Sequence, residues 1–180
     1  AISGMDRFSL NPAGGSQGIF SNVAVIKAYH DARGEGAQRN EIITTILSHP
    51  GNAGTAAALG YKVITLYPDE SGIPDLEALK AAVSEHTAAL LITNPEDTGI
   101  YNEKIRQFVD IVHAAGGLCV YDQANLNGLM GITRARDAGF DLCQFNLHKT
   151  FSSPHGSQGP GSGAQGCTAE LAKFLPVPTV

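Results

Sequence analysis

The sequence has 180 residues, of which 43% are hydrophobic and 16% charged, a composition typical of one globular domain with a sizeable core. Its net charge of −5 excludes a basic surface for nucleic acid or for an anionic membrane, so we expect neither partner. No run of about 18 apolar residues could span a bilayer, and the first residues lack the pattern of a signal peptide. We therefore expect a cytoplasmic protein, or a mitochondrial matrix protein in a eukaryote.

The predicted elements alternate between helix and strand. A Gly-rich turn at residues 11–18 leads into a helical run from about residue 17 to residue 33. Short apolar runs rich in Val, Ile and Leu then predict five strands, at residues 42–47, 62–66, 88–93, 118–122 and 142–146. Asp75 and Asn102 are capping residues before two further helices, and Gly116 and Gly117 end the second.

This order predicts an α/β fold of three layers, with a mostly parallel sheet and helices on both faces. The strands lack polar alternation, as expected for strands buried on both sides. A long Gly- and Ser-rich loop with Pro154 and Pro160 is predicted at residues 148–166. In such sheets a ligand binds at the carboxyl ends of the strands.

The turn NPAGGSQG places glycines directly before a helix, where free backbone N–H groups and the helix dipole favour a phosphate. Taken alone, this signal more often indicates only a tight turn that leads into a helix. The string GSGAQG at residues 161–166 fits a dinucleotide fingerprint, but it follows no predicted strand and we discount it.

Asp122 and Lys149 both follow apolar strands and should meet at the carboxyl edge of the sheet. A lysine after a buried strand is expected to be partly desolvated, which favours the neutral amine that a Schiff base needs. A salt bridge between the two side chains is the alternative. Asn94 and His49 follow two other strands at the same edge. Together with the Gly-rich turn, these groups are the parts that pyridoxal phosphate requires.

Four strings, SLNPAGGSQG, ITNPEDTGIY, YDQANLNG and FNLHKTFSSPHG, resemble the P-protein family of the glycine cleavage system, pyridoxal-phosphate-dependent glycine decarboxylases. The resemblance extends over nearly the whole chain, to the closing LAKFLPVP. It implies the large domain of the aspartate aminotransferase fold type, with residues 1–180 as the core of that cofactor-binding domain and without the small C-terminal domain.

The resemblance also implies roles for individual residues. Lys149 is expected to form the Schiff base, Asp122 to contact the pyridine nitrogen, and His49 to stack on the ring. The remaining expected cofactor contacts are Gly15, Ser16 and Gln17 at the phosphate, Asn94 or Thr98 near the ring edge, and Asn125 and His148. Two loops depart from the family pattern: HPGNAGT stands at His49, and Ser157 and Gln158 follow PHG.

The implied reaction is glycine decarboxylation, with transfer of the aminomethyl group to the lipoyl arm of the H-protein. Glycine, lipoylated H-protein and a partner P-protein subunit or second copy are the expected partners. Two alternatives stay open. Another pyridoxal enzyme, an aminotransferase or a lyase, needs an arginine for the substrate carboxylate, with Arg7, Arg134 and Arg136 as candidates. A non-catalytic remnant would serve as a binding or assembly module.

Other polar residues have simpler interpretations. His155 is expected to order its loop, and a hydrolase built on Ser152, Ser153 and His155 lacks a nucleophile elbow. His30, His86 and His113 fall late in predicted helices, where a solvated imidazole is expected. The three cysteines, Cys119, Cys143 and Cys167, are read as small buried thiols of a reducing compartment, and no metal-ligand spacing is present.

Overall fold

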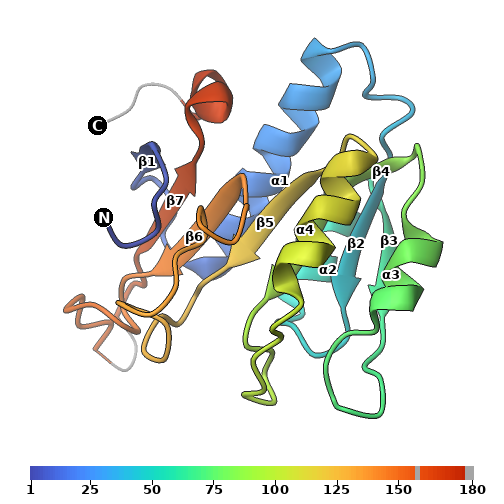
Figure 1. Cartoon of the computed structure of the whole chain (residues 1–180). Coiled ribbons are helices and arrows are strands. Elements are labelled where there is room, and N and C mark those ends of the chain that lie inside the picture. The colour runs from blue at the N-terminus through green and yellow to red at the C-terminus, as the bar shows by residue number, and fades with distance from the viewer. Residues whose placement is uncertain (157–158, 177–180) are drawn as a thin grey trace.

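The computed structural model describes residues 1–156 and 159–176, in which one sheet lies between two layers of helices (Figure 1). The strands are β1 (Arg7–Ser9), β2 (Glu41–Thr45), β3 (Lys62–Leu66), β4 (Thr87–Thr93), β5 (Leu118–Asp122), β6 (Leu142–Asn146) and β7 (Gly163–Cys167). The helices are α1 (Gly15–Ala32), α2 (Gly51–Ala58), α3 (Leu76–Ala82) and α4 (Ile105–Ala114), followed by the 3₁₀ helix η1 (Ala169–Phe174).

The seven strands are ordered β1-β7-β6-β5-β4-β2-β3. The five strands from β2 to β6 run parallel, whereas β7 is antiparallel to β6 and β1 is antiparallel to β7. The carboxyl ends of the parallel strands therefore meet at one edge, and the start of β7 joins them there. This edge gathers the loops that carry the predicted site.

Each face of the sheet has its own apolar core. On one face α3 and α4 pack through residues such as Leu79, Phe108 and Val112. On the other face α1 and α2 pack through residues such as Val23, Ile26 and Ala56. Figure 1 shows α1 behind the sheet and α3 and α4 in front of it. The predicted three-layer, mostly parallel α/β fold is confirmed.

The five predicted strands are all present, but the predicted loop at residues 148–166 contains part of a strand that we did not predict. β7 occupies Gly163–Cys167, and all five of its residues are buried. Its sequence, GAQGC, has no β-branched or aromatic residue. The apolar pattern by which we predicted strands is therefore missing here. The helix α2 and the short strand β1 were not predicted either, and the loop residues Ser157 and Gln158 lie outside the described residues.

Close packing explains the glycines of β7. A Cβ atom added at Gly166 would lie 2.7 Å from the Phe8 ring, and one added at Gly163 would lie 3.0 Å from the carbonyl oxygen of Gly14. The first distance is shorter than real Cβ contacts, and the second is tighter than most of them. The glycines therefore let β7 lie directly against β1 and against the turn before α1.

The three histidines that were expected late in helices differ in burial and in hydrogen bonding. His30, expected to be solvated, is completely buried and places Nε2 3.0 Å from the carbonyl oxygen of Ala88 and Nδ1 3.3 Å from Glu35. That expectation was wrong because α1 continues over the sheet and carries His30 against β4. His86 lies beyond the end of α3 with its side chain about half exposed. The His113 ring, in the last turn of α4, is 2.7 Å from Asp141.

Cys119, Cys143 and Cys167 are free and buried, as expected. Burial raises the pKa of the Cys143 thiol to about 12 and that of the Cys167 thiol to about 11. No helix within residues 1–156 and 159–176 combines the length and the hydropathy that a membrane crossing requires.

The His113–Asp141 pair generates a prediction about pH. The hydrogen bond to Asp141 raises the pKa of His113 above its ordinary 6.5, so the stabilisation is complete below pH 6.5 and is lost as pH rises through the higher folded value. In the full-length protein, His113→Asn should therefore lower the free energy of unfolding more at pH 6 than at pH 9. We expect a difference of about 1 kcal/mol or less, because the ring is partly exposed.

Urea denaturation at both pH values measures this difference. Asp141→Asn, which removes the carboxylate but keeps an oxygen for the amide of Cys119, should lose the same pH-dependent part. A stability loss in His113→Asn that is equal at pH 6 and pH 9 contradicts the assignment.

Candidate functional site

The carboxyl edge of the sheet contains two adjoining cavities that share His49, Asp122, Ala124 and Lys149. The larger has a volume of about 340 Å³ and extends over the loops that follow β4 and β5. The smaller, of about 100 Å³, extends under the start of α1 toward Gly15 and Ser16. The structure thus brings the predicted lysine, aspartate and histidine together with the predicted phosphate turn.

Asp122 is the last residue of β5 and is buried, with 4% of its surface exposed. Its Oδ1 accepts hydrogen bonds from Nε2 of Gln144 and, at 3.1 Å, from the backbone amide of Ala124. Its Oδ2 is buried without a hydrogen-bond partner. Burial raises the pKa of Asp122, and the Gln144 bond and the positive charges of His49 and Lys149 act against that rise.

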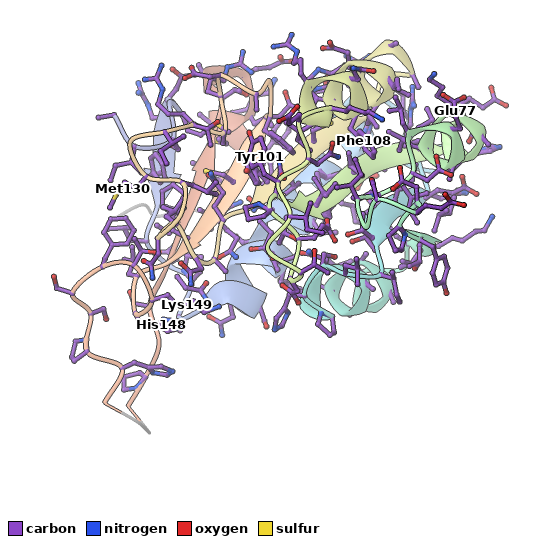
Figure 2. The ribbon with its side chains drawn as sticks, turned by 60° about the horizontal axis from the view of Figure 1, so that its bottom comes forward. Glu77, Tyr101, Phe108, Met130, His148 and Lys149 are labelled. Atoms are coloured by element: carbon purple, nitrogen blue, oxygen red, sulfur yellow. The ribbon has the colours of Figure 1, made fainter. Side chains whose placement is uncertain are left out.

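Lys149 lies three residues beyond β6, and its backbone amide donates to the carbonyl oxygen of Asn146 at 3.1 Å. Figure 2 shows Lys149 and His148 beside the start of α1, at the base of the loop that follows β6. The Lys149 side chain lines both cavities but is exposed. The partial desolvation expected from the sequence is therefore not found, and the ion pairs of the described residues do not include one between Lys149 and Asp122.

The first turn of α1 leaves its backbone N–H groups without a side-chain cap. Gly14 precedes the helix with an extended backbone, and no side chain caps the first turn. The amide of Ala13 donates to Oε1 of Gln17 at 2.7 Å, which fixes the turn. The helix begins at Gly15, two residues earlier than predicted, so the amides of Gly15, Ser16 and Gln17 lie in its first turn.

Three predicted cofactor contacts, Asn94 and Thr98 near the ring edge and Asn125, differ from one another in the structure. Asn94 lines the larger cavity, but its side chain exchanges two hydrogen bonds with the backbone of Asn102, at 2.8 and 3.1 Å. Its amide therefore secures the loop after β4. Asn125 lines the same cavity and is exposed. Thr98 is exposed and lies outside the cavity lining, whereas Thr93, at the end of β4, belongs to it.

The histidines of the edge lie on different loops. His49 is exposed, lines both cavities and accepts a hydrogen bond from the amide of Gly51 at 2.9 Å. His148 is half-buried, with Nδ1 3.0 Å from the amide of Ser162, and its ring lies 4.4 Å from the ring of His155. His148 and His155 line a third cavity of about 310 Å³, together with Gly15, Ser16 and Gln17.

Sequence reasoning did not single out Glu96, which lies in the wall of the larger cavity with only 3% of its surface exposed. Both carboxyl oxygens lie within 2.7–2.9 Å of the hydroxyl of Thr45, so the loop after β4 is bonded to the last residue of β2. Burial raises the pKa of Glu96 to about 7, against the Thr45 hydrogen bond. A glutamate after Asn94 and Pro95 reads as a solvated turn residue, so the sequence carried no signal for its burial.

Arginines do not complete the site within the described residues. Arg134 pairs with Asp137, Arg136 donates to the carbonyl oxygen of Phe140, and Arg7 donates to that of Asp6. None of the three lines the cavities at Lys149. An aminotransferase that holds its substrate carboxylate by one of these arginines therefore finds no support here.

One group of side chains with metal-ligand chemistry lies at the opposite edge of the sheet. His113, Cys119 and Asp141 place their ligand atoms within 4.8 Å of one another, although no sequence spacing indicated it. Asp141 already accepts hydrogen bonds from His113 and from the amide of Cys119, at 2.7 and 2.8 Å. Burial raises the pKa of the Cys119 thiol well above its usual value, and the thiol donates to the carbonyl oxygen of Val109. Asp141 thus joins α4 to the start of β5 by hydrogen bonds.

The groups at the carboxyl edge fit pyridoxal phosphate in three respects. The unpartnered Oδ2 of the buried Asp122 offers an acceptor to a protonated ring nitrogen. The uncapped amides of α1 offer donors to a phosphate. The Lys149 amine reaches the same cavity as both. Such a set of convergent polar groups in one cavity is typical of a small-molecule site.

Known proteins match the chain over almost its full length. A protein of Pyrococcus abyssi named probable glycine dehydrogenase (decarboxylating) subunit 2 is 52% identical over 179 residues, which is 99% of this chain and 36% of that protein. A protein of the same name from Caldanaerobacter subterraneus is 50% identical, also over 99% of this chain and over 37% of its own length. The chain thus spans little more than a third of these relatives.

Solved structures agree with the fold. A sphingosine-1-phosphate lyase of Burkholderia pseudomallei superposes with a TM-score of 0.73 at 19% identity, over 93% of this chain and 39% of that one. A PLP-dependent aminotransferase of Streptococcus suis gives 0.72 at 16% identity, over 96% and 45%. The aminotransferase class-V family matches residues 15–157. Since that match covers most of the chain, the protein belongs to the aminotransferase class-V family.

Proposed function

We propose that this chain is the cofactor-binding core of one subunit of a pyridoxal-phosphate-dependent glycine decarboxylase, which passes the aminomethyl group to the lipoyl arm of an H-protein. Its residues 1–180 would form the centre of the large domain. Two relatives that are 50% and 52% identical carry the name glycine dehydrogenase (decarboxylating) subunit 2. They support a second subunit as partner and glycine as substrate.

The observation that carries the proposal is the unpartnered Oδ2 of the buried Asp122, in the same cavity as the amine of Lys149. A buried carboxylate oxygen without a donor is costly unless a ligand supplies one. A protonated pyridine nitrogen supplies that donor together with a positive charge. Asp122 would then keep the ring protonated and fix its position at the end of β5.

When bound, pyridoxal phosphate supplies an electron-withdrawing ring that takes up the electron pair released with carbon dioxide. The amides at the start of α1 would hold the phosphate, and His49 would cover one face of the ring. Lys149 would hold the cofactor by its amine and, once glycine has taken its place, move a proton at that amine. Asn125 and His148 would add contacts at the rim of the cavity.

The proposed overall reaction balances without another oxidant. The bond between the α-carbon and the carboxyl carbon of glycine breaks, and the carboxyl group leaves as carbon dioxide. The electron pair left on the α-carbon forms a bond to one lipoyl sulfur, and the S–S bond breaks. The second sulfur takes a proton and becomes a thiol, so the disulfide is reduced as the glycine carbon is oxidised.

The three buried thiols are consistent with a reducing compartment, and we propose a cytoplasmic location for the enzyme. The open cavity beside Lys149 is consistent with access for a tethered arm, because the amine is exposed at its mouth.

Covalent trapping tests the cofactor site. The full-length protein is mixed with pyridoxal phosphate, reduced with borohydride and digested, and the modified peptide is identified by mass spectrometry. We expect the label on Lys149, and its loss in Lys149→Arg but not in Lys104→Arg, which changes an exposed lysine at the start of α4. Equal labelling of several surface lysines contradicts the site.

The same experiment on residues 1–180 alone separates a complete site from a remnant. Label on Lys149 in the full-length protein but not in the isolated chain means that the remaining polypeptide completes the site.

Isotope exchange tests the reaction. With lipoylated H-protein and the partner subunit present, labelled bicarbonate should enter the carboxyl group of glycine, because decarboxylation is reversible before the aminomethyl group leaves. Lys149→Ala should lower the exchange rate by about 10²-fold or more. Turnover of other amino acids without glycine exchange favours another pyridoxal enzyme.

A further inference from the structure

A row of polar side chains crosses the sheet from Asp122 toward its far edge. Asp122 of β5 is the register partner of Gln144 of β6, and Gln144 is the partner of Gln165 of β7. Register partners point to the same face of a sheet, here the face that α1 covers. Asp122 is 4% exposed, and Gln144 and Gln165 are completely buried. We call these three residues the polar row.

The row is unusual because its neighbours on the same face, on the side away from the cavity, are apolar. Leu142 precedes Gln144 by two residues in β6, and Cys167 follows Gln165 by two residues in β7, and both are completely buried in the core under α1. A buried amide costs free energy unless its donors and acceptors are used. Two glutamine amides in this core therefore require a reason beyond packing.

One end of the row is bonded to Asp122. Nε2 of Gln144 donates to Oδ1 of Asp122, which leaves Oδ2 free toward the cavity. The other end is bonded to α1, because the Ser21 hydroxyl donates to Oε1 of Gln165 at 2.7 Å. The row thus connects the proposed ring contact with the helix whose start is the proposed phosphate site.

The middle of the row has one acceptor and one donor left. Oε1 of Gln144 and Nε2 of Gln165 are both buried without a hydrogen-bond partner. Directly opposite residues of an antiparallel pair have Cβ atoms about 5 Å apart, within reach of two long amides. The two unused groups are complementary, a donor on Gln165 and an acceptor on its register partner Gln144.

The helix α1 also packs closely against the side chain of Gln144. A Cβ atom added at Gly18 would lie 3.1 Å from both Cβ and Oε1 of Gln144. A larger residue at position 18 would push the amide away. The helix therefore restrains Gln144 by contact at Gly18 and restrains Gln165 by the Ser21 hydrogen bond.

We propose that Gln165, held by Ser21, is a positioning residue that orients Gln144 and through it fixes the Asp122 carboxylate toward the cofactor ring. The inference rests on the proposed cofactor site, which it extends to Gln144 in the lining of the smaller cavity and to Gln165, which lines neither cavity at Lys149. Gln144 of β6 fixes the position of Oδ1 of Asp122, and Gln165 of β7 fixes the amide of Gln144. The side-chain orientation set in β7 thus determines that in β6, and through it that in β5.

The affinity of the full-length protein for pyridoxal phosphate, measured by absorbance titration, tests the row. Asp122→Asn tests the cofactor site itself. It should weaken binding more than tenfold, because it removes the charge opposite the ring nitrogen. Gln165→Leu should weaken binding about fivefold, the equivalent of one hydrogen bond, and Gln144→Leu at least as much. Ser21→Ala should have a smaller effect of the same sign, and Ser21→Thr, which keeps the hydroxyl, should bind as the unchanged protein does.

A double-mutant cycle distinguishes positioning from simple destabilisation. If Gln165 acts through Gln144, adding Gln165→Leu to Gln144→Leu should change the affinity less than twofold. The matched control is His30→Leu, which removes a buried side-chain contact at the other end of α1. It should lower the melting temperature without changing the affinity.

The pH dependence of binding supplies a second readout. The bond from Gln144 lowers the pKa of Asp122, and the charged groups that face Asp122 are His49 after β2 and Lys149 after β6. Without that bond the carboxylate takes up a proton at a higher pH. The pH below which cofactor affinity falls should therefore move upward in Gln144→Leu and, by a smaller step, in Gln165→Leu.

The outcomes separate this inference from the proposed function. Unchanged affinity in Asp122→Asn overturns the cofactor site itself. Weakened binding in Asp122→Asn with unchanged affinity and pH dependence in Gln165→Leu overturns the positioning role alone. Independent effects of Gln144→Leu and Gln165→Leu also overturn it.

Discussion

The register of the central parallel strands is the constraint on which the site depends. Thr93 of β4 is paired with Asp122 of β5, and Asp122 with Gln144 of β6, so the ends of β4 and β5 lie along one line with Gln144, two residues before the end of β6. A shift of one residue in β5 would turn Asp122 to the face of α3 and α4 and bring Tyr121 or Gln123 to its place. The strands carry apolar side chains on both faces of the sheet, and the packing of these side chains against the helices holds the register.

The helix α1 joins the requirements of the fold and of the site. Its apolar side, with Ile19, Val23 and Ile26, covers the sheet. Its first turn has no side-chain cap and faces the cavity. The missing cap lowers the stability of the helix by about 1 kcal/mol. Packing on the sheet offsets this loss, and a bound anion would stabilise the first turn as well. The helix is thus held by the packing of its middle, and its start keeps free N–H groups at the cavity.

The sequence was sufficient for the layers and for the parallel strands, because β2 to β6 are short apolar runs separated by helix caps and glycines. It failed for β7, whose GAQGC pattern is set by contact with Phe8 and with the turn before α1 rather than by propensity. It also failed for His30, since burial of a helix end depends on how far the helix continues over the sheet.

The site was predictable where a residue follows a strand. Asp122, Lys149 and His49 reach one cavity, as their positions indicated. Hydrogen-bond partners were not predictable in the same way. The Asn94 side chain is bonded to Asn102, and the burial of Glu96 depends on the Thr45 hydroxyl at the end of β2. Such pairings depend on loop geometry, for which neither periodicity nor capping signals exist.

The position of β7 in the sheet has a consequence for synthesis on the ribosome. β1, near the start of the chain, pairs with β7, and β7 ends at residue 167. Until that segment has emerged, β1 lacks its neighbour, β6 has one open edge, and α1 has no partner for Ser21. Asp122 and Lys149 are therefore made well before the support of Gln165 exists. The nascent chain must keep its apolar helix face from aggregating during that interval, and the cavity at Asp122 reaches its final shape only after β7 has paired with β6 and β1.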